Sequence, residues 1–161
     1  ILGPLTNPAN ASRQLLGVYS KDLVEKLAEV LMNLGVNRGM SVCGSDGLDE
    51  ITVTGPTHCC EIKDGKLTSF DITPEQFGLG TYELKDIIGG TPEENAAITK
   101  DILSGKETGA KRDIVLMNAG MGIYLGKEDI SMQEAIDLAA EMIDSGKAYE
   151  KMQQFVKASQ E

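Results

Sequence analysis

The stretch "QLLGVYSKDLVEKLAEVLMNLGVNRGMSVCGS", residues 14–45, decides the fold. Its first residues, 14–20, form a short apolar run typical of a buried strand, and "GMSVCGS" (39–45) has the same character. Between them, apolar residues recur at helical spacing: Leu23, Leu27, Val30, Leu31 and Leu34. Ser20 is placed to cap this helix and Gly35 to end it. A strand–helix–strand unit implies parallel pairing of its two strands.

Three short β-rich runs follow this unit: "EITVTG" (50–55), "HCCEIK" (58–63) and "KLTSFDI" (66–72). Asp64-Gly65, between the last two runs, is a hairpin signal and predicts an antiparallel excursion. A loop over 73–90 leads into the rest of the chain. We therefore expect an α/β fold with a mixed, mostly parallel sheet flanked by helices, and incomplete within this chain.

The C-terminal half is predicted to be helical. Two helix starts combine an N-cap residue with a capping-box glutamate: Thr91-Pro92-Glu93-Glu94 and Ser131-Met132-Gln133-Glu134. The two helices are expected to end at Gly105 and Gly146. The last helix carries apolar side chains on one face, which we expect in the core: Tyr149, Met152, Phe155 and Val156.

The segment 110–125 has two interpretations. It is apolar on most sides and could begin as a strand at "DIVLM" (113–117). The glycines Gly120 and Gly122 favour instead a buried helix that a neighbouring element can approach closely. We favour the helix.

Composition restricts the class of protein. The chain has 161 residues, 41% of them hydrophobic, and a formal net charge of −10, which suits one globular domain and disfavours nucleic acid or an anionic membrane as partners. The longest apolar run, "IVLMNAGMGIYLG" (114–126), is too short to span a membrane. Three cysteines form no disulfide framework, which favours a reducing cytoplasm. Cys59 and Cys60 beside His58 are expected to be ordinary strand residues, because adjacent strand residues point to opposite faces.

An adjacent acidic pair, Asp49 and Glu50, follows the second predicted strand. Open α/β sheets place their ligands at this end of a strand, and Mg²⁺ is usually held by one or two carboxylates together with substrate phosphates. Gly44 and Gly47 would let the backbone bend sharply beside them. The alternative is that Asp49 caps a turn and Glu50 is merely solvated.

Four blocks of the sequence together resemble the C-terminal part of the anthranilate phosphoribosyltransferases: "GPLTNPA" (3–9), "VCGSDGLDE" (42–50), "PEENAAITKDILSG" (92–105) and "GAKRDIVLMNAG" (109–120). The resemblance covers essentially the whole chain. It implies transfer of a phosphoribosyl group from phosphoribosyl pyrophosphate to anthranilate, in tryptophan biosynthesis. It also implies a large α/β domain like that of the pyrimidine nucleoside phosphorylases, attached to a small helical domain.

The same resemblance assigns residues and partners. Asp49 and Glu50 match the magnesium-binding acidic pair of the family, and Gly3 and Pro4 match the Gly-Pro whose backbone lines the anthranilate path. Asn7 and Pro8 complete that motif without an assigned contact. No side chain is expected to act as a nucleophile, because the substrate amine can attack directly. A homodimer and a glutamine amidotransferase subunit are the implied assembly.

We expect the chain, residues 1–161, to be a piece of a longer protein. The resemblance places the helical domain, the glycine-rich phosphate loop and the arginine for the anthranilate carboxylate upstream of Ile1. The piece is therefore expected to be inactive alone. Two alternatives stay open: a related nucleoside phosphorylase, and a non-catalytic module that serves as a binding domain.

Overall fold

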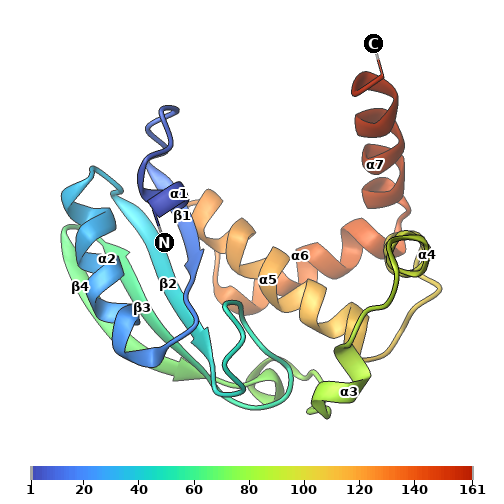
Figure 1. The fold of residues 1–161 in the computed structure, drawn as a ribbon, viewed down its shortest axis with the longest axis horizontal. Coiled ribbons are helices and arrows are strands. Elements are labelled where there is room, and N and C mark those ends of the chain that lie inside the picture. The colour runs from blue at the N-terminus through green and yellow to red at the C-terminus, as the bar shows by residue number, and fades with distance from the viewer. Residues whose placement is uncertain (1, 161) are drawn as a thin grey trace.

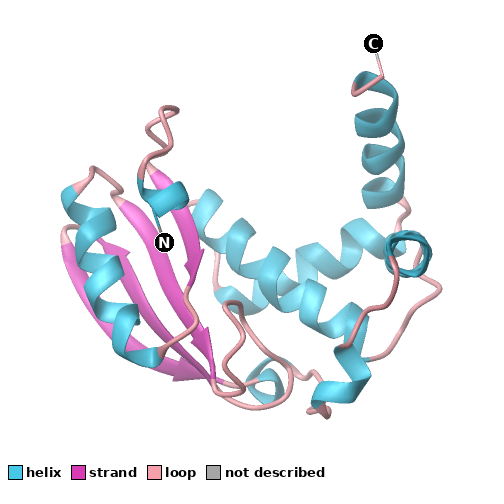
Figure 2. Ribbon diagram, viewed as in Figure 1, coloured by secondary structure: helices cyan, strands magenta, loops and turns pink. Residues whose placement is uncertain are grey.

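The computed structural model describes residues 2–160 and is built on a four-stranded sheet with helices on both faces (Figure 1, Figure 2). The strands lie in sequence order: β1 (Arg13–Gly17), β2 (Arg38–Gly44), β3 (Thr57–Lys63) and β4 (Lys66–Ile72). β1 and β2 are parallel, whereas β2–β3 and β3–β4 are antiparallel. The mixed sheet is confirmed. The expectation that it is mostly parallel was wrong, because both β3 and β4 belong to the hairpin excursion.

The strand–helix–strand unit is present, with one difference at its start. A 3₁₀ turn, η1 (Lys21–Leu23), precedes helix α2 (Val24–Asn33). Ser20 gives no side-chain cap, and its carbonyl instead accepts the Leu23 N–H at 3.0 Å. Gly35 follows the helix at a φ of +98°, a left-handed conformation that favours glycine.

The hairpin forms where the sequence predicts it. Asp64 (φ 51°) and Gly65 (φ 70°) are both left-handed, as a two-residue turn of the twisted type requires. The run 50–55 is a different matter, because it is irregular rather than a strand. Instead of another strand, its backbone partners are the Asn118 side chain, the hydroxyls of Thr52 and Thr57, and the Tyr82 N–H in the loop after β4.

The remaining helices are α1 (Leu2–Leu5), η2 (Pro74–Phe77), α3 (Leu84–Ile87), α4 (Pro92–Leu103), α5 (Ala110–Gly126), α6 (Met132–Asp144) and α7 (Lys147–Ala158). Both predicted capping boxes form: Glu94 N–H donates to Thr91 Oγ1 at 3.3 Å, and Glu134 N–H donates to Ser131 Oγ at 3.2 Å. Gly105 and Gly146 follow α4 and α6 in left-handed conformations. Within residues 2–160, none of the helices has the length and apolar character needed to span a bilayer.

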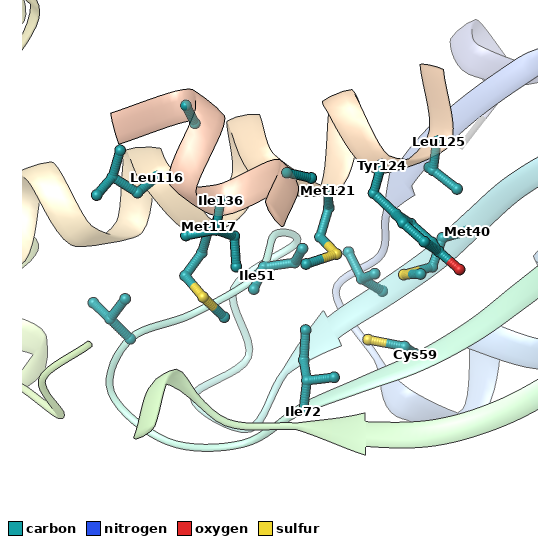
Figure 3. Packing of buried hydrophobic residues seen from close by; sticks show 14 of the residues in the cluster. Met40, Ile51, Cys59, Ile72, Leu116, Met117, Met121, Tyr124, Leu125 and Ile136 are labelled. Atoms are coloured by element: carbon teal, nitrogen blue, oxygen red, sulfur yellow. The ribbon is translucent and has the colours of Figure 1, made fainter. Parts of the chain in front are cut away.

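The sheet separates two apolar clusters. Alternation along β2 and β3 directs Met40, Val42 and Cys59 to the face covered by α5 and α6, and Cys43 and Cys60 to the face covered by α2. The larger cluster lies under α5 (Figure 3), where several of its side chains are fully buried: Met40, Ile51, Met117 and Met121. Cys59 and Cys60 thus point into different cores, as strand geometry predicts.

Helix 110–126 is confirmed as a helix, and one of its two glycines explains its packing. A Cβ added at Gly120 would lie 2.4 Å from Ile136 Cγ1 and 2.9 Å from Ile136 Cα, so α6 approaches α5 too closely for any side chain there. The expectation for Gly122 was wrong, because nothing lies within 4 Å of an added Cβ. Of the two glycines, only Gly120 lies at the close contact between these two helices.

The apolar face of α7 is another correction. Phe155 is 71% exposed and Val156 47%, and no residue of α7 is buried. The helix contacts α6 and α4 only near its start and then extends away from the rest of the chain (Figure 1). The periodicity correctly predicted an amphipathic helix, but the described residues contain no surface that covers it.

The two glycines of α5 supply a matched pair of variants. Gly120→Ala should destabilise the fold by about 1–3 kcal/mol, because α6 must shift to accept the methyl group. Gly122→Ala should stabilise it by about 0.5–1 kcal/mol, because alanine lowers the entropic cost of a helical position with free space. Urea unfolding of both variants checks this. Equal effects of the two substitutions would contradict the packing described here.

Candidate functional site

The acidic pair lies in the loop between β2 and β3, where both parallel strands end (Figure 1). The side chains of Asp49 and Glu50 are exposed to solvent. Neither carboxylate forms a hydrogen bond or ion pair with any part of residues 2–160. The structure therefore presents two adjacent carboxylates with free oxygens at the edge where open α/β sheets commonly bind ligands.

A close backbone contact fixes where the pair sits. A Cβ added at Gly17, the last residue of β1, would lie only 1.6 Å from the Asp49 carbonyl oxygen. The backbone of the acidic pair thus rests directly on the end of β1, and only glycine allows this approach. The loop turns back at Gly47, which has a φ of 85° and donates its N–H to the Gly44 carbonyl at 3.0 Å.

Asp46, a third carboxylate in this loop, has a structural role. Its Oδ1 accepts the Leu48 N–H at 3.1 Å, and its Oδ2 accepts the hydroxyls of Thr52 and Thr54, each at 2.5 Å. Burial raises the pKa of Asp46, but these hydrogen bonds lower it by more, so the net shift is downward. Asp46 stays charged and closes the loop on itself.

The far side of the acidic pair is held by α5. Asn118 Oδ1 accepts the Ile51 N–H at 3.0 Å, and Asn118 Nδ2 donates to the Ile51 carbonyl at 2.7 Å. Ile51 is fully buried among the residues of the larger cluster (Figure 3). The residue that follows Glu50 is therefore fixed both by its side chain and by its backbone.

The electrostatics of the pair suit a divalent cation. Glu50 reaches solvent, yet the protein around it desolvates its carboxyl group, which raises its pKa, and repulsion from Asp49 and Asp46 raises it further. A cation would relieve that repulsion. Within residues 2–160 no group of three or more His, Cys, Asp or Glu side chains is arranged to hold a metal. Two carboxylates alone fit Mg²⁺, which keeps several waters and binds substrate phosphates.

Gly3 and Pro4 lie at the other end of the sheet. They belong to α1, beside the start of β1, where Gln14 Nε2 donates to the Pro4 carbonyl at 3.3 Å (Figure 1). Asp49, in contrast, touches Gly17 at the end of the same strand. The structure does not bring the two predicted substrate-binding elements together.

His58 is the strongest competing candidate, because it has two carboxylate partners that the sequence does not reveal. Its Nδ1 lies 2.5 Å from Asp71 Oδ1, and its Nε2 lies 2.7 Å from Glu25 Oε1. Both ring nitrogens are thus occupied by α2 and β4, and neither is left to activate the neighbouring Cys43. The arrangement joins the helix to the sheet and provides no general base.

The cysteines are equally unsuited to nucleophilic chemistry. All three are buried, and burial raises the pKa of each thiol, that of Cys59 to about 12. A thiol reacts as the thiolate, so these side chains are inert near neutral pH.

Sequence reasoning found the acidic pair but missed the residues that support it. Gly17 stands in the first strand with no local sign of a contact 32 positions later. Asn118 is half-buried and interrupts an apolar helix, and a polar residue in such a place is the one signal that could have marked it as a hydrogen-bonding group of the core. Asp46 was not singled out, because the adjacent pair Asp49 and Glu50 is the clearer acidic pattern in the same loop.

Comparison with known proteins gives a consistent result. The family model described as the a/b domain of the glycosyl transferase family matches residues 1–149. Anthranilate phosphoribosyltransferase of Endomicrobium trichonymphae is 52% identical over 161 residues, which are all of this chain and 48% of that protein. The enzyme of Methanobrevibacter smithii is 47% identical over 156 residues, 97% of this chain and 46% of that protein.

Solved structures agree. The anthranilate phosphoribosyltransferase of Thermus thermophilus superposes with a TM-score of 0.88 at 40% identity, covering 97% of this chain and 46% of that one. The Saccharomyces cerevisiae enzyme in complex with PRPP and Mg superposes with a TM-score of 0.87 at 33% identity, covering 98% and 45%. The chain thus spans about half the length of the relatives it matches.

The His58 bridge predicts a pH-dependent stability. Partial burial lowers the pKa of His58, but its hydrogen bonds to Asp71 and Glu25 raise it by more, so the pKa in the folded state lies above 6.5. A raised pKa means that protonation favours folding, fully below the unfolded-state pKa and progressively less as the pH rises through the folded-state value. His58→Gln should therefore cost more stability at pH 6 than at pH 9.

We expect a difference of on the order of 0.5–1 kcal/mol between the two pH values, because both carboxylates are about half exposed and solvent screens them. Urea unfolding of the chain and the variant at each pH measures it. The lowered pKa of Glu25, caused mainly by its hydrogen bond to His58, keeps that carboxylate charged at pH 6. A penalty that is the same at both pH values would show that His58 is not protonated in the folded state.

Proposed function

The chain belongs to the glycosyl transferase family, a/b domain, and from that premise we propose that the whole protein is an anthranilate phosphoribosyltransferase. It would transfer the phosphoribosyl group of phosphoribosyl pyrophosphate to the amine of anthranilate, with release of pyrophosphate. One observation carries the proposal: the free carboxylates of Asp49 and Glu50 lie at the ligand-binding edge of the sheet, in a chain that is 52% identical over its full length to a protein with this activity.

Asp49 and Glu50 are the residues that would hold Mg²⁺. When bound, the ion would neutralise the negative charge that develops on the pyrophosphate leaving group. The chain's own contribution is to keep the two carboxylates adjacent and facing solvent. The contact with Gly17 on one side and the buried Ile51 on the other allow the pair little freedom to turn away.

The proposed reaction needs no nucleophilic side chain from these residues. The amine of anthranilate would form the new bond to the anomeric carbon of the ribose while the bond to the pyrophosphate oxygen breaks, and the proton that the nitrogen loses would pass to water or to the released pyrophosphate. In agreement, His58 has both nitrogens engaged, and the three thiols are buried with raised pKa values. Binding, orientation and charge stabilisation would supply the catalysis.

The other elements of the proposal concern the rest of the protein. The backbone at Gly3 and Pro4 would line the path of anthranilate, at a distance from the acidic pair that the remaining part of the protein would bridge. We propose that a helical domain, a phosphate-binding loop and the site for the anthranilate carboxylate lie outside these 161 residues. A cytoplasmic homodimer, with a glutamine amidotransferase as partner, stays a prediction.

A joined protein tests the function. The part of the Endomicrobium trichonymphae relative that this chain does not span would be fused to residues 1–161. Replacing Asp49 with Asn and Glu50 with Gln keeps shape but removes charge. Formation of phosphoribosyl-anthranilate should fall by roughly 10²-fold or more, because the charge stabilisation of the leaving group is lost. Fluorescence of the product measures the rate.

Glu93 and Glu150 provide the control, since they are exposed carboxylates of α4 and α7, remote from the loop after β2, and neither has a side-chain hydrogen bond or ion pair within residues 2–160. Replacing both with Gln should leave the rate within about 2-fold, as expected for exposed charges away from the site. The 161-residue chain alone should be inactive. Undiminished turnover of the Asp49/Glu50 variant at limiting Mg²⁺ would overturn the assignment.

A further inference from the structure

We propose that Asn118 is the positioning residue of the acidic pair: from helix α5, it fixes the direction of Asp49 and Glu50 by holding the backbone of Ile51. The inference rests on the proposed function, because it gives the acidic pair its role. Asn118 itself would touch neither metal nor substrate. It would act through the next residue along the chain.

The hydrogen bonds of Ile51 support this role. Its N–H donates to Asn118 Oδ1 at 3.0 Å, and its carbonyl accepts from Asn118 Nδ2 at 2.7 Å. Ile51 is fully buried, and within residues 2–160 neither of these backbone groups has another partner. A buried backbone group without a partner is strongly unfavourable. At Ile51, one carboxamide thus supplies both hydrogen bonds that a neighbouring strand would supply.

Asn118 is in turn fixed to its own helix. Its Nδ2 also donates to the Ile114 carbonyl at 3.0 Å, one turn earlier in α5. The side chain therefore has a single orientation, and the helix on which it sits is the most deeply buried one of the fold. Helix α5 thus fixes the Asn118 side chain, and Asn118 fixes the backbone of Ile51. Ile51 in turn limits the movement of Glu50 and Asp49, which precede it in the chain.

The opposite side of the pair is limited as well. The Asp49 carbonyl lies against Gly17, so the loop cannot move towards β1. Release of Ile51 would therefore let the pair swing in only one direction, away from the end of the sheet. A metal site loses affinity when its ligands are no longer held, and loss of such a supporting residue typically weakens binding 10–100-fold.

A second asparagine offers a matched control. Asn95 Oδ1 accepts the Gly90 N–H at 2.8 Å, and Asn95 Nδ2 donates to the Gly90 carbonyl at 3.1 Å. This is the same two-bond arrangement as at Asn118, but it closes the start of α4 at an exposed position. Asn95→Ala therefore removes the same chemistry without touching the acidic loop.

The experiment uses the joined protein described above and Mn²⁺ alone, as a spectroscopic substitute for Mg²⁺. Electron paramagnetic resonance measures free Mn²⁺ during titration, and hydrogen exchange followed by NMR reports the Ile51 amide. Asn118→Ala should weaken Mn²⁺ binding about 10-fold or more and expose the Ile51 amide to fast exchange. Asn95→Ala should change neither. In the joined protein, Asn118→Ala should raise KM for Mg²⁺–phosphoribosyl pyrophosphate.

A double variant and a reference variant separate the possible results. Asn118→Ala combined with Gly122→Ala, a substitution expected to stabilise the same helix, should remain folded and still bind Mn²⁺ weakly. If Asn118→Ala binds Mn²⁺ like the unmodified chain, or if both it and the double variant fail to fold, Asn118 is not a local positioning residue. If Asp49→Asn/Glu50→Gln binds Mn²⁺ undiminished, the proposed function fails instead.

Discussion

Helix α5 must lie close against the sheet, and the rest of the structure depends on how it is held there. At its start, buried Asp113 accepts the Tyr82 hydroxyl at 2.8 Å and fixes the long loop after β4. At its end, Arg13 donates to the Leu125 carbonyl at 3.1 Å and Arg38 to the Tyr124 carbonyl at 3.0 Å. These two arginines satisfy helix carbonyls that have no partner within the helix. Between its two ends, α5 covers the larger apolar cluster and contributes Asn118, which bonds the backbone of Ile51 beside the acidic pair.

The elements predicted correctly from the sequence are those whose signals are local. The Asp64-Gly65 turn needs two left-handed residues, and the capping boxes at Thr91 and Ser131 need only a partner three positions away. The errors concern interactions across the chain. Residues 50–55 have the composition of a strand, yet the backbone of Ile51 pairs with Asn118, 67 positions away, and the Val53 carbonyl accepts the Tyr82 N–H. Periodicity likewise identifies the apolar face of α7 but carries no information about what covers it.

The candidate site shows the same division. Asp49 and Glu50 could be predicted because two adjacent carboxylates after a predicted strand form a local sequence pattern. The residues that support them could not be predicted. Gly17 is needed only because the loop folds back onto β1, where an added Cβ would lie 1.6 Å from the Asp49 carbonyl oxygen. Tertiary contact, rather than composition, makes that glycine necessary. The same holds for His58, which has no partner nearby in sequence but two carboxylates in space.

Three carboxylates within five residues repel one another, and the loop divides them between two tasks. Asp46 uses its oxygens to accept the Leu48 N–H and the hydroxyls of Thr52 and Thr54, which lowers its pKa and compensates its burial. Asp49 and Glu50 accept no such bonds within residues 2–160, and desolvation, together with repulsion from Asp49 and Asp46, raises the pKa of Glu50. That repulsion would open an unsupported loop. Because Asp46 closes the turn from within and Asn118 holds Ile51 from the core, the two remaining carboxylates stay together, where a bound cation would neutralise both.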